Sequence, residues 1–104
     1  MNDPRRILTP AETADELAGT VFVHTGGRLD GAYRTDDFAS AVELLDEVAA
    51  VADAMNHHPD VQLGWGRIAF ELSSHDVGGV TSRDVDLARR IDALAAAQGA
   101  TPGN

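Results

Sequence analysis

The sequence predicts an α+β domain of two layers, in which a four-stranded antiparallel sheet carries helices on one face. Three observations lead to this fold class. Three segments begin with helix-start signals and repeat apolar residues at three- and four-residue intervals, and two pairs of segments alternate apolar and polar residues around glycine-containing turns. The order along the chain is helix, two strands, helix, two strands, helix, which suits one sheet with helices packed against it.

The first helix is predicted to begin after Thr9, which can cap it. Pro10 then stands at the first helical position, and Glu12 can return a hydrogen bond from its side chain to the backbone of the cap. We expect this helix to stop at Gly19, because glycine readily adopts the left-handed conformation that ends many helices. Leu17 is its clearest core contact.

Two short β-favouring segments follow, residues 20–24 and 29–34, and the turn between them contains two glycines. They predict an antiparallel hairpin, in which Gly31 weakens the second strand because it has no side chain to pack. His24 lies on the first strand with no partner motif nearby. We interpret it as a surface or edge residue rather than as part of a site.

The second helix is predicted from a start signal at residues 35–37, with acidic groups near the positive end of the helix dipole. Its apolar stripe comprises Phe38, Ala41 or Val42, Leu45, Val48 or Ala49, Ala52 and Met55. The helix must end near Asn56 or His57, because Pro59 biases the preceding residue away from the α conformation. The pair His57 and His58 therefore lies at the end of this helix.

Residues 61–65 and 68–72 alternate apolar and polar side chains and predict a second hairpin around a Gly-Trp-Gly-Arg turn. If the alternation continues, His75 points away from the core face of the sheet, which suits a site residue better than a core histidine.

The last helix is predicted to begin in the capping pattern from Thr81 to Asp84 and to end near Gly99.

We expect one domain over residues 1–104, because a chain of this length with 43% hydrophobic residues can bury one core. The core should cover about residues 9–98, with loosely ordered tails at 1–8 and 99–104. Only 5% of the residues are aromatic, so small aliphatic side chains must build most of the core. Association into oligomers would help a core of this kind.

The formal net charge is -9, and every basic residue is an arginine. Direct binding of nucleic acid is disfavoured, because a nucleic-acid binder needs a basic face. The absence of cysteine excludes a disulfide framework and thiolate chemistry. No apolar run approaches the ~20 residues of a membrane span, and the N-terminal residues lack the apolar segment of a secretory signal, so we expect a cytoplasmic protein without membrane association.

Three of the four histidines, His57, His58 and His75, are expected at the ends of structural elements. An imidazole has an unperturbed pKa of about 6.5, so it can give or accept a proton near neutral pH. Two nearby imidazoles in opposite protonation states can remove one proton and deliver another without a metal. The dehydration of a carbinolamine needs such a pair of transfers, because a proton leaves nitrogen while the adjacent hydroxyl is protonated and departs as water.

Two other interpretations of the histidines stay open. A His-His pair is common at helix ends on protein surfaces, where it has no chemical role. The three histidines together with Asp53, Asp60 or Asp76 could also bind zinc, although the chain lacks a helical pair of histidines four residues apart and a cysteine knuckle. Nothing marks an activated serine nucleophile.

A set of residues with characteristic spacing runs through the second half of the chain: Asn56-His57-His58-Pro59, Trp65, Ser74-His75, Gly79, Thr81-x-x-Asp84 and Leu87-Ala88. In these residues the chain resembles the pterin-4a-carbinolamine dehydratase family, over roughly residues 9–94. The motif is specific, because three histidines, a glycine and an aspartate at the opening of a helix rarely occur together at these distances.

The resemblance implies a β-β-α-β-β-α sheet domain with an additional N-terminal helix, which assembles as a homodimer or homotetramer. It implies an enzyme, a 4a-hydroxytetrahydrobiopterin dehydratase, which is a lyase. The family reaction converts 4a-hydroxytetrahydropterin to quinonoid dihydropterin and so recycles the cofactor of aromatic amino acid hydroxylases. The pterin is the substrate, and family members need no metal and no other cofactor.

By the same resemblance, His57 and His75 would be the acid/base pair, and His58 would hold the pterin and assist proton transfer. Asp84 would lie nearby, at the start of the last helix, as an orienting or binding residue. The other positions implied to contact the substrate are Asp53, Pro59 and Trp65. Asp53 lies one helical turn before His57 and could orient that ring.

The chain departs from the family pattern at several positions. Asp53 is shorter by one methylene than the Glu of some members, and Thr20 stands where a tryptophan often opens the first strand. Ala32 replaces a bulkier residue, and Gly66 replaces the usual Asn beside the aromatic residue. These departures affect packing, assembly and pterin contacts more than the proton chemistry.

The alternative function is a protein-binding or assembly module without catalysis. Members of the same family are known as a dimerisation cofactor of a homeodomain transcription factor and as assembly-factor-like proteins. An acidic surface fits contact with protein rather than with DNA. Relatives of the assembly type tend to lose the histidines, so the complete set in this chain favours the enzyme.

Overall fold

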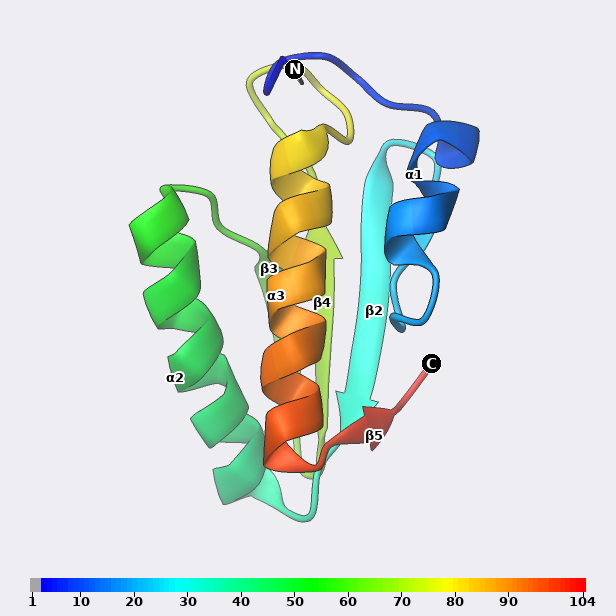
Figure 1. Ribbon diagram of the computed structural model, residues 1–104. Coiled ribbons are helices and arrows are strands. Elements are labelled where there is room, and N and C mark those ends of the chain that lie inside the picture. Colours follow the sequence, from blue (N-terminus) through cyan, green and yellow to red (C-terminus); the bar gives the residue numbers. More distant parts are fainter. Residues whose placement is uncertain (1–2) are drawn as a thin grey trace.

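The computed structural model describes residues 3–104, so residues 1 and 2 of the predicted N-terminal tail lie outside the described residues. Figure 1 shows the helices standing beside a sheet. In chain order the elements are α1 (Pro10–Leu17), β1 (Val23–Thr25), β2 (Arg28–Arg34), α2 (Phe38–Met55), β3 (Asp60–Gly64), β4 (Arg67–Leu72), α3 (Ser82–Gln98) and β5 (Thr101–Pro102).

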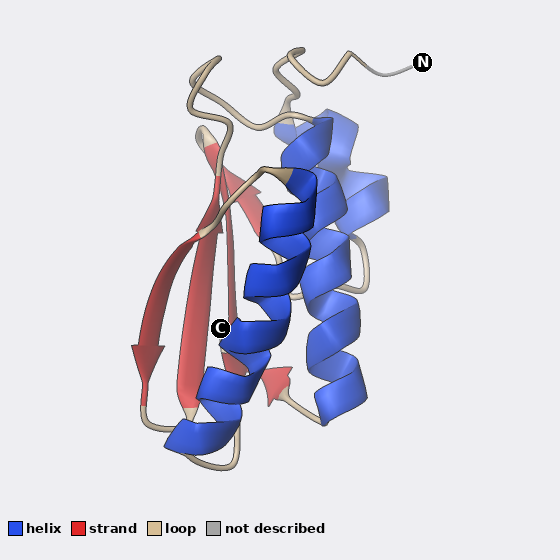
Figure 2. Cartoon of the chain, turned by 90° about the vertical axis from the view of Figure 1, so that its left-hand side faces the viewer, coloured by secondary structure: helices blue, strands red, loops and turns tan. Residues whose placement is uncertain are grey.

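The strands form one antiparallel sheet in the spatial order β1-β2-β4-β3, and β5 pairs with the end of β2. All helices pack on one face of this sheet and leave the other face uncovered (Figure 2). The predicted two-layer α+β fold and its order of elements are therefore confirmed. The short fifth strand is an addition that the sequence analysis did not anticipate.

The prediction of a loosely ordered C-terminal tail at residues 99–104 is wrong. The tail pairs with the end of β2, and the Gly103 backbone N–H donates to the Ala32 carbonyl at 2.9 Å. The side chain of Asn104 accepts from the Ala32 backbone N–H at 2.7 Å and donates to the Val21 carbonyl at 2.5 Å. A two-residue strand has no periodicity to detect, and Pro102 and Gly103 are typical of turns, so sequence patterns favoured a frayed end.

The segment before α1, for which the sequence predicts a loosely ordered tail, is also attached to the domain. The backbone N–H of Leu8 donates to the Val80 carbonyl at 2.8 Å, and Arg6 forms an ion pair with Glu12 at 2.8 Å. The predicted capping box of Thr9 and Glu12 is confirmed. The ordered part of the domain thus extends on both sides of the predicted core, residues 9–98.

The first strand begins three residues later than predicted, at Val23 instead of Thr20. Thr20 instead completes the turn after α1, because both its backbone N–H and its hydroxyl donate to the Leu17 carbonyl. Phe22 is buried, and its ring lies against Gly31, where an added Cβ would come within 2.8 Å of the ring. The glycine that weakened the predicted strand therefore makes room for this aromatic side chain.

The predicted apolar stripe of α2 is correct in its middle and wrong at its start. The buried residues of α2 are Ala41, Leu44, Val48 and Ala52. Phe38 is 49% exposed and Val42 is also exposed, so the first turn of the stripe faces solvent. The helix packs against α3 as well as against the sheet, which rotates its buried face toward Leu44.

Four chain segments meet at one end of the domain. There α2 ends, β3 begins, β4 ends and α3 begins (Figure 1). Asn56 adopts a left-handed conformation with φ 52°, and its backbone N–H bonds to carbonyl groups of the last helical turn. This sharp end of α2 directs the following histidines toward the start of α3.

Candidate active site

The three histidines of the predicted set line one open hollow of about 460 Å³ at this end of the domain. Pro59, adjacent to the histidine pair, lies on its wall as well. The ring of His57 is largely buried, whereas His58 and His75 are exposed. The structure therefore brings together the residues expected to carry acid/base chemistry, although they come from two separate loops.

His57 is held by a buried aspartate at the start of α3. Its Nε2 lies 2.5 Å from Oδ1 of Asp84, whose side chain is fully buried. The other oxygen of Asp84 accepts hydrogen bonds from the hydroxyl of Ser74 at 2.8 Å and from the backbone N–H of Thr81 at 2.9 Å. Because the Ser74 and Thr81 partners are donors, the arrangement suits an ionised carboxylate that accepts from a protonated Nε2.

The contact with Asp84 determines which tautomer the neutral His57 ring adopts. A proton on Nε2 leaves Nδ1 of His57 as the ring nitrogen that can accept a proton. A charge-assisted hydrogen bond of this length also fixes the orientation of the ring. Asp84 thus lies in contact with His57, as the family resemblance implied for an orienting residue.

Asp53 does not orient His57, contrary to the expectation from its position one turn earlier. Its Oδ1 lies 2.8 Å from Nε2 of His58 instead. The helix ends before His57, and the left-handed Asn56 turns the ring of His57 inward toward α3. Asp53 and His58 are both exposed, so water screens this pair.

His75 follows the end of β4 on a short loop that closes on itself. The backbone N–H of Ser74 donates to the Gly79 carbonyl at 2.8 Å, and the Gly78 N–H donates back to the Ser74 carbonyl at 2.9 Å. The prediction that His75 faces away from the core is in agreement with its exposed side chain. Ser74, one residue earlier, points into the protein and reaches Asp84.

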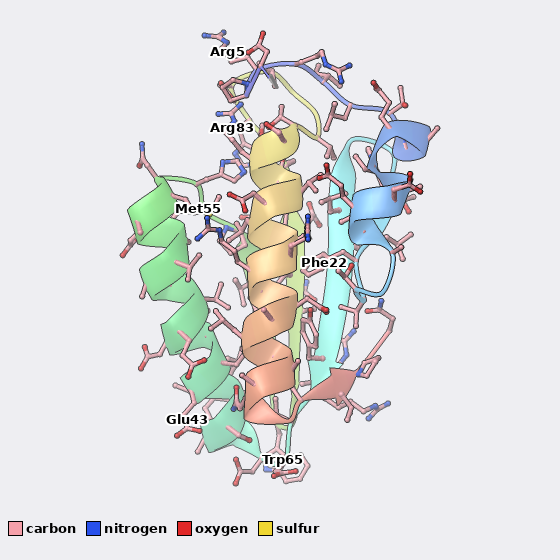
Figure 3. All side chains as sticks on the ribbon, viewed as in Figure 1. Arg5, Phe22, Glu43, Met55, Trp65 and Arg83 are labelled. Carbon is pink, nitrogen blue, oxygen red and sulfur yellow. The ribbon has the colours of Figure 1, made fainter. Side chains whose placement is uncertain are left out.

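The structure does not bring Trp65 to the histidines within one chain. Trp65 lies in the β3–β4 turn with 76% of its surface exposed, at the opposite end of the sheet from Arg83 (Figure 3). The five residues of β3 separate the two ends. At about 3.3 Å per residue, Trp65 lies roughly 15–20 Å from the hollow.

Sequence reasoning gave no acid/base or pterin-binding role to three residues of the site, and it considered one of them, Asp76, only as a zinc ligand. Ser74 was noted only as a neighbour of His75, yet a polar residue with the same strand parity as Phe70 and Leu72 signals a buried hydrogen bond. Asp76 and Arg83 form an ion pair at 2.9 Å on the wall of the hollow. The hydrogen bond from the guanidinium of Arg83 lowers the pKa of the Asp76 carboxyl below its usual value.

His24, Gly66 and Ala32 have structural roles. Nδ1 of His24 lies 2.8 Å from the hydroxyl of the buried Thr13, which ties β1 to α1. Gly66 has φ 68° in the tight β3–β4 turn. Glycine suits this left-handed conformation best, although the Asn that the family pattern has there tolerates it better than most other residues do. Ala32 is buried beside Asn104.

Residues 3–104 contain neither a cluster of metal ligands nor a membrane-spanning helix. No three histidine, aspartate or glutamate side chains converge as metal ligands there, so the described part of the chain offers no support for the zinc interpretation. Within the same residues, no helix is long and apolar enough to cross a membrane.

Comparison with known proteins identifies relatives over most of the chain. A family model described as pterin 4 alpha carbinolamine dehydratase matches residues 6–94. A Nocardia farcinica protein named "Putative pterin-4-alpha-carbinolamine dehydratase" is 40% identical over 74 residues, which cover 71% of this chain and 78% of that protein. A Roseiflexus castenholzii protein of the same name is 35% identical over 89 residues, which cover 85% and 96%.

Two solved structures share the fold. The transcriptional coactivator/pterin dehydratase from Brucella melitensis matches with a TM-score of 0.79 and 26% identity over 86% of this chain and 99% of that chain. A pterin dehydratase-like protein identified as a RuBisCO assembly factor in the alpha-carboxysome matches with a TM-score of 0.62 and 22% identity, over 74% and 92%. The second likeness shows the fold alone.

Proposed function

Because the chain belongs to the pterin carbinolamine dehydratase family, we propose that it removes water from 4a-hydroxytetrahydropterin to give quinonoid dihydropterin. The observation that carries the proposal is the hollow lined by His57, His58 and His75, in which one histidine is fixed by a buried carboxylate. The pterin is the substrate, and the proposed chemistry requires neither a metal nor another cofactor.

In the proposed mechanism, one imidazole removes the proton from the ring nitrogen while an imidazolium protonates the neighbouring hydroxyl. The carbon–oxygen bond then breaks, water leaves, and a carbon–nitrogen double bond forms. His57 and His75 are proposed for these two transfers, each of which contributes typically ~10²- to 10⁴-fold. After turnover the two rings have exchanged protonation states, and exchange with solvent at the exposed His75 restores them.

Asp84 is proposed to hold His57 in the tautomer that leaves Nδ1 for the substrate. It would also stabilise the imidazolium form, because a buried cation needs a paired anion. Asp53 would act on His58 in a similar but weaker way, since both groups are exposed. His58 is thereby positioned at the rim of the hollow, where it can contact the pterin.

The test is an assay of water loss from a synthetic 4a-hydroxytetrahydropterin. We expect wild-type protein to accelerate the reaction with a bell-shaped pH profile, and His57→Ala and His75→Ala each to lower turnover by about 10²-fold or more. His24→Ala is the matched control, because His24 bonds to Thr13 outside the hollow and should retain turnover. A wild-type protein without activity would refute the proposal.

A second candidate is a protein-binding module, which is supported by the description of the Brucella melitensis protein as both a transcriptional coactivator and a pterin dehydratase. On this proposal the purified chain would lack dehydratase activity and retain one stoichiometric protein partner. The two functions are separable by the His57→Ala variant, which would lose catalysis and keep binding. Retention of the three histidines in one hollow favours the enzyme.

A further inference from the structure

The His75 ring differs from the other two histidine rings of the hollow, because it has no side-chain partner among residues 3–104. Asp84 holds the ring of His57 from the start of α3. Asp53 lies against the ring of His58. No hydrogen bond or ion pair joins the exposed ring of His75 to any other residue of the described range. The position of this ring in the hollow therefore depends on the loop that carries it.

The loop that carries His75 is firmly held at its base. The Ser74 backbone N–H donates to the Gly79 carbonyl at 2.8 Å, which closes the loop. The side chain of Ile7 packs against Gly79, where an added Cβ would come within 2.9 Å of the isoleucine. These contacts fix the base of the loop, and His75 and Asp76 extend beyond it.

Arg83 reaches the loop beyond this base. It is the second residue of α3 and lies at the end of the domain that holds the hollow (Figure 3). Its Nη2 donates to Oδ1 of Asp76 at 2.9 Å, and its Nε donates to the hydroxyl oxygen of Thr81 at 3.2 Å. Two donors of one planar guanidinium thus attach the residue next to His75 to the start of the helix. The bond from Arg83 also lowers the pKa of the Asp76 carboxyl, so the pair stays ionised where imidazoles exchange protons.

The first turn of α3 contacts both loops of the hollow. Asp84 directly follows Arg83 and binds the ring of His57, so two consecutive residues of one helical turn hold the two loops. A pair of acid/base groups works only if both reach the same substrate, and misplacing a group by about 1 Å can cost about 10²-fold in rate. The start of α3 is therefore a common reference for the rings of His57 and His75.

The ion pair of Asp76 and Arg83 contributes little to the stability of the fold. Its two side chains are 45% and 28% exposed, and ion pairs in contact with water often contribute nothing measurable to stability. Holding Asp76 in one place nevertheless restricts the neighbouring residue, His75, whose ring has no other partner in the described range. The effect of the pair is therefore on the position of this ring rather than on the fold.

We propose that Arg83, through its ion pair with Asp76, is the positioning residue for His75 in the dehydration. The inference rests on the proposed function, because it requires His75 to transfer a proton to or from the substrate. Arg83 touches neither the substrate nor the transferred proton and acts only through the loop that carries the ring. Loss of the ion pair should therefore lower turnover and leave substrate binding by the rest of the hollow unchanged.

The test is a double-mutant cycle in the assay of water loss from 4a-hydroxytetrahydropterin. Arg83→Ala should lower kcat about 10-fold and change KM less than about two-fold, because the ring is displaced while the binding surface is kept. Asp76→Asn should have the same effect, since it removes the charge of the partner. In the His75→Ala background, Arg83→Ala should cause no further loss, because the ring through which it acts is absent.

Arg90→Ala is the matched control, because Arg90 pairs with Asp86 at 3.0 Å on the same helix and does not line the hollow. It should turn over like wild type. Backbone ¹⁵N relaxation gives a readout that needs no turnover: the order parameter of residues 75–77 should be about 0.85 in wild type and control and about 0.6 or lower in Arg83→Ala. Both variants should melt within about 5 °C of wild type, as circular dichroism would show.

Three results would overturn the proposal. The first is an Arg83→Ala variant whose turnover or loop order equals that of wild type. The second is an equal loss of turnover in the His75→Ala background, which would mean that Arg83 acts on the substrate itself. The third is a much lower melting temperature, which would make Arg83 a residue of the fold. A wild-type chain without activity would refute the proposed function instead, and the order parameters would still decide whether Arg83 holds the loop.

Discussion

The substitution Asp84→Asn tests the network that holds His57. In the native protein the carboxylate accepts from the His57 ring, the Ser74 hydroxyl and the Thr81 backbone N–H, at 2.5, 2.8 and 2.9 Å. An amide has the same shape but only one oxygen. Its nitrogen is a donor, so the His57 ring keeps this bond only in its other tautomer, with the proton on Nδ1, whereas with the proton on Nε2 a donor faces a donor.

The expected loss of stability follows from counting these bonds. Hydrogen bonds to a charged group contribute about 1.5–3 kcal/mol each and neutral ones about 0.5–1.5 kcal/mol, so losing the charge costs about 1 kcal/mol per bond. An unsatisfied buried donor adds about 1–3 kcal/mol. We therefore expect Asp84→Asn to lower the free energy of unfolding by about 3 kcal/mol if all three bonds are kept without the charge, and by up to about 6 kcal/mol if a donor is left unsatisfied, a large part of the ~5–15 kcal/mol typical of small domains.

Urea unfolding followed by circular dichroism measures this loss. The matched control is Asp86→Asn, the same change on the same helix, where an exposed carboxylate pairs with Arg90 at 3.0 Å. That exposed pair contributes little, so the control should stay within about 0.5 kcal/mol of wild type. If the two variants were equally stable, the reasoning that Asp84 is a buried charge satisfied by three donors would be refuted.

Three further predictions follow from the same structure. Ser74→Ala should lower the free energy of unfolding by about 1–2 kcal/mol, whereas Ser73→Ala on the opposite face should stay within about 0.5 kcal/mol, as urea unfolding would show. Hydrogen bonds from Ser40 to Asp37 and from Arg83 to Asp76 lower the pKa of both carboxyls in the folded state. Their stabilisation is present above the unfolded pKa of about 4 and is lost as the pH falls below it, so the melting temperature should drop between about pH 5 and pH 3; a flat profile would contradict this. Deletion of residues 101–104 removes the hydrogen bonds to β2 and should cost about 2–4 kcal/mol in the same unfolding assay, and an unchanged stability would mean that the tail is not bound.

The sequence predicted the parts of the fold that depend on local chemistry. Capping at Thr9 and Thr81 and the stop before Pro59 located helix ends within one or two residues, because the bonds involved connect residues close in the chain. The alternation of residues 68–72 likewise identified the buried face of β4. These signals do not depend on contacts with distant parts of the chain.

The features that sequence reasoning missed depend on contacts between distant segments. Asp53 was expected to orient His57, but the left-handed turn at Asn56 rotates that ring toward α3, and no local pattern reports this rotation. The docked tail depends on Asn104 reaching the backbone of Ala32, 72 residues earlier in the chain. Only the assembled sheet provides that partner.

The position of His57 and Asp84 has a physical reason in the polarity of the two helices. His57 follows directly after the end of α2, where unsatisfied carbonyl groups favour a cation, and Asp84 is the third residue of α3, where free N–H groups favour an anion. In the proposed mechanism, each member of the buried pair therefore lies at the helix end that stabilises its charge when His57 is protonated. In the middle of either helix the backbone would give no such support, because those N–H and carbonyl groups bond to each other. The acid/base role proposed for the largely buried His57 therefore fits its position, where one helix ends and another begins.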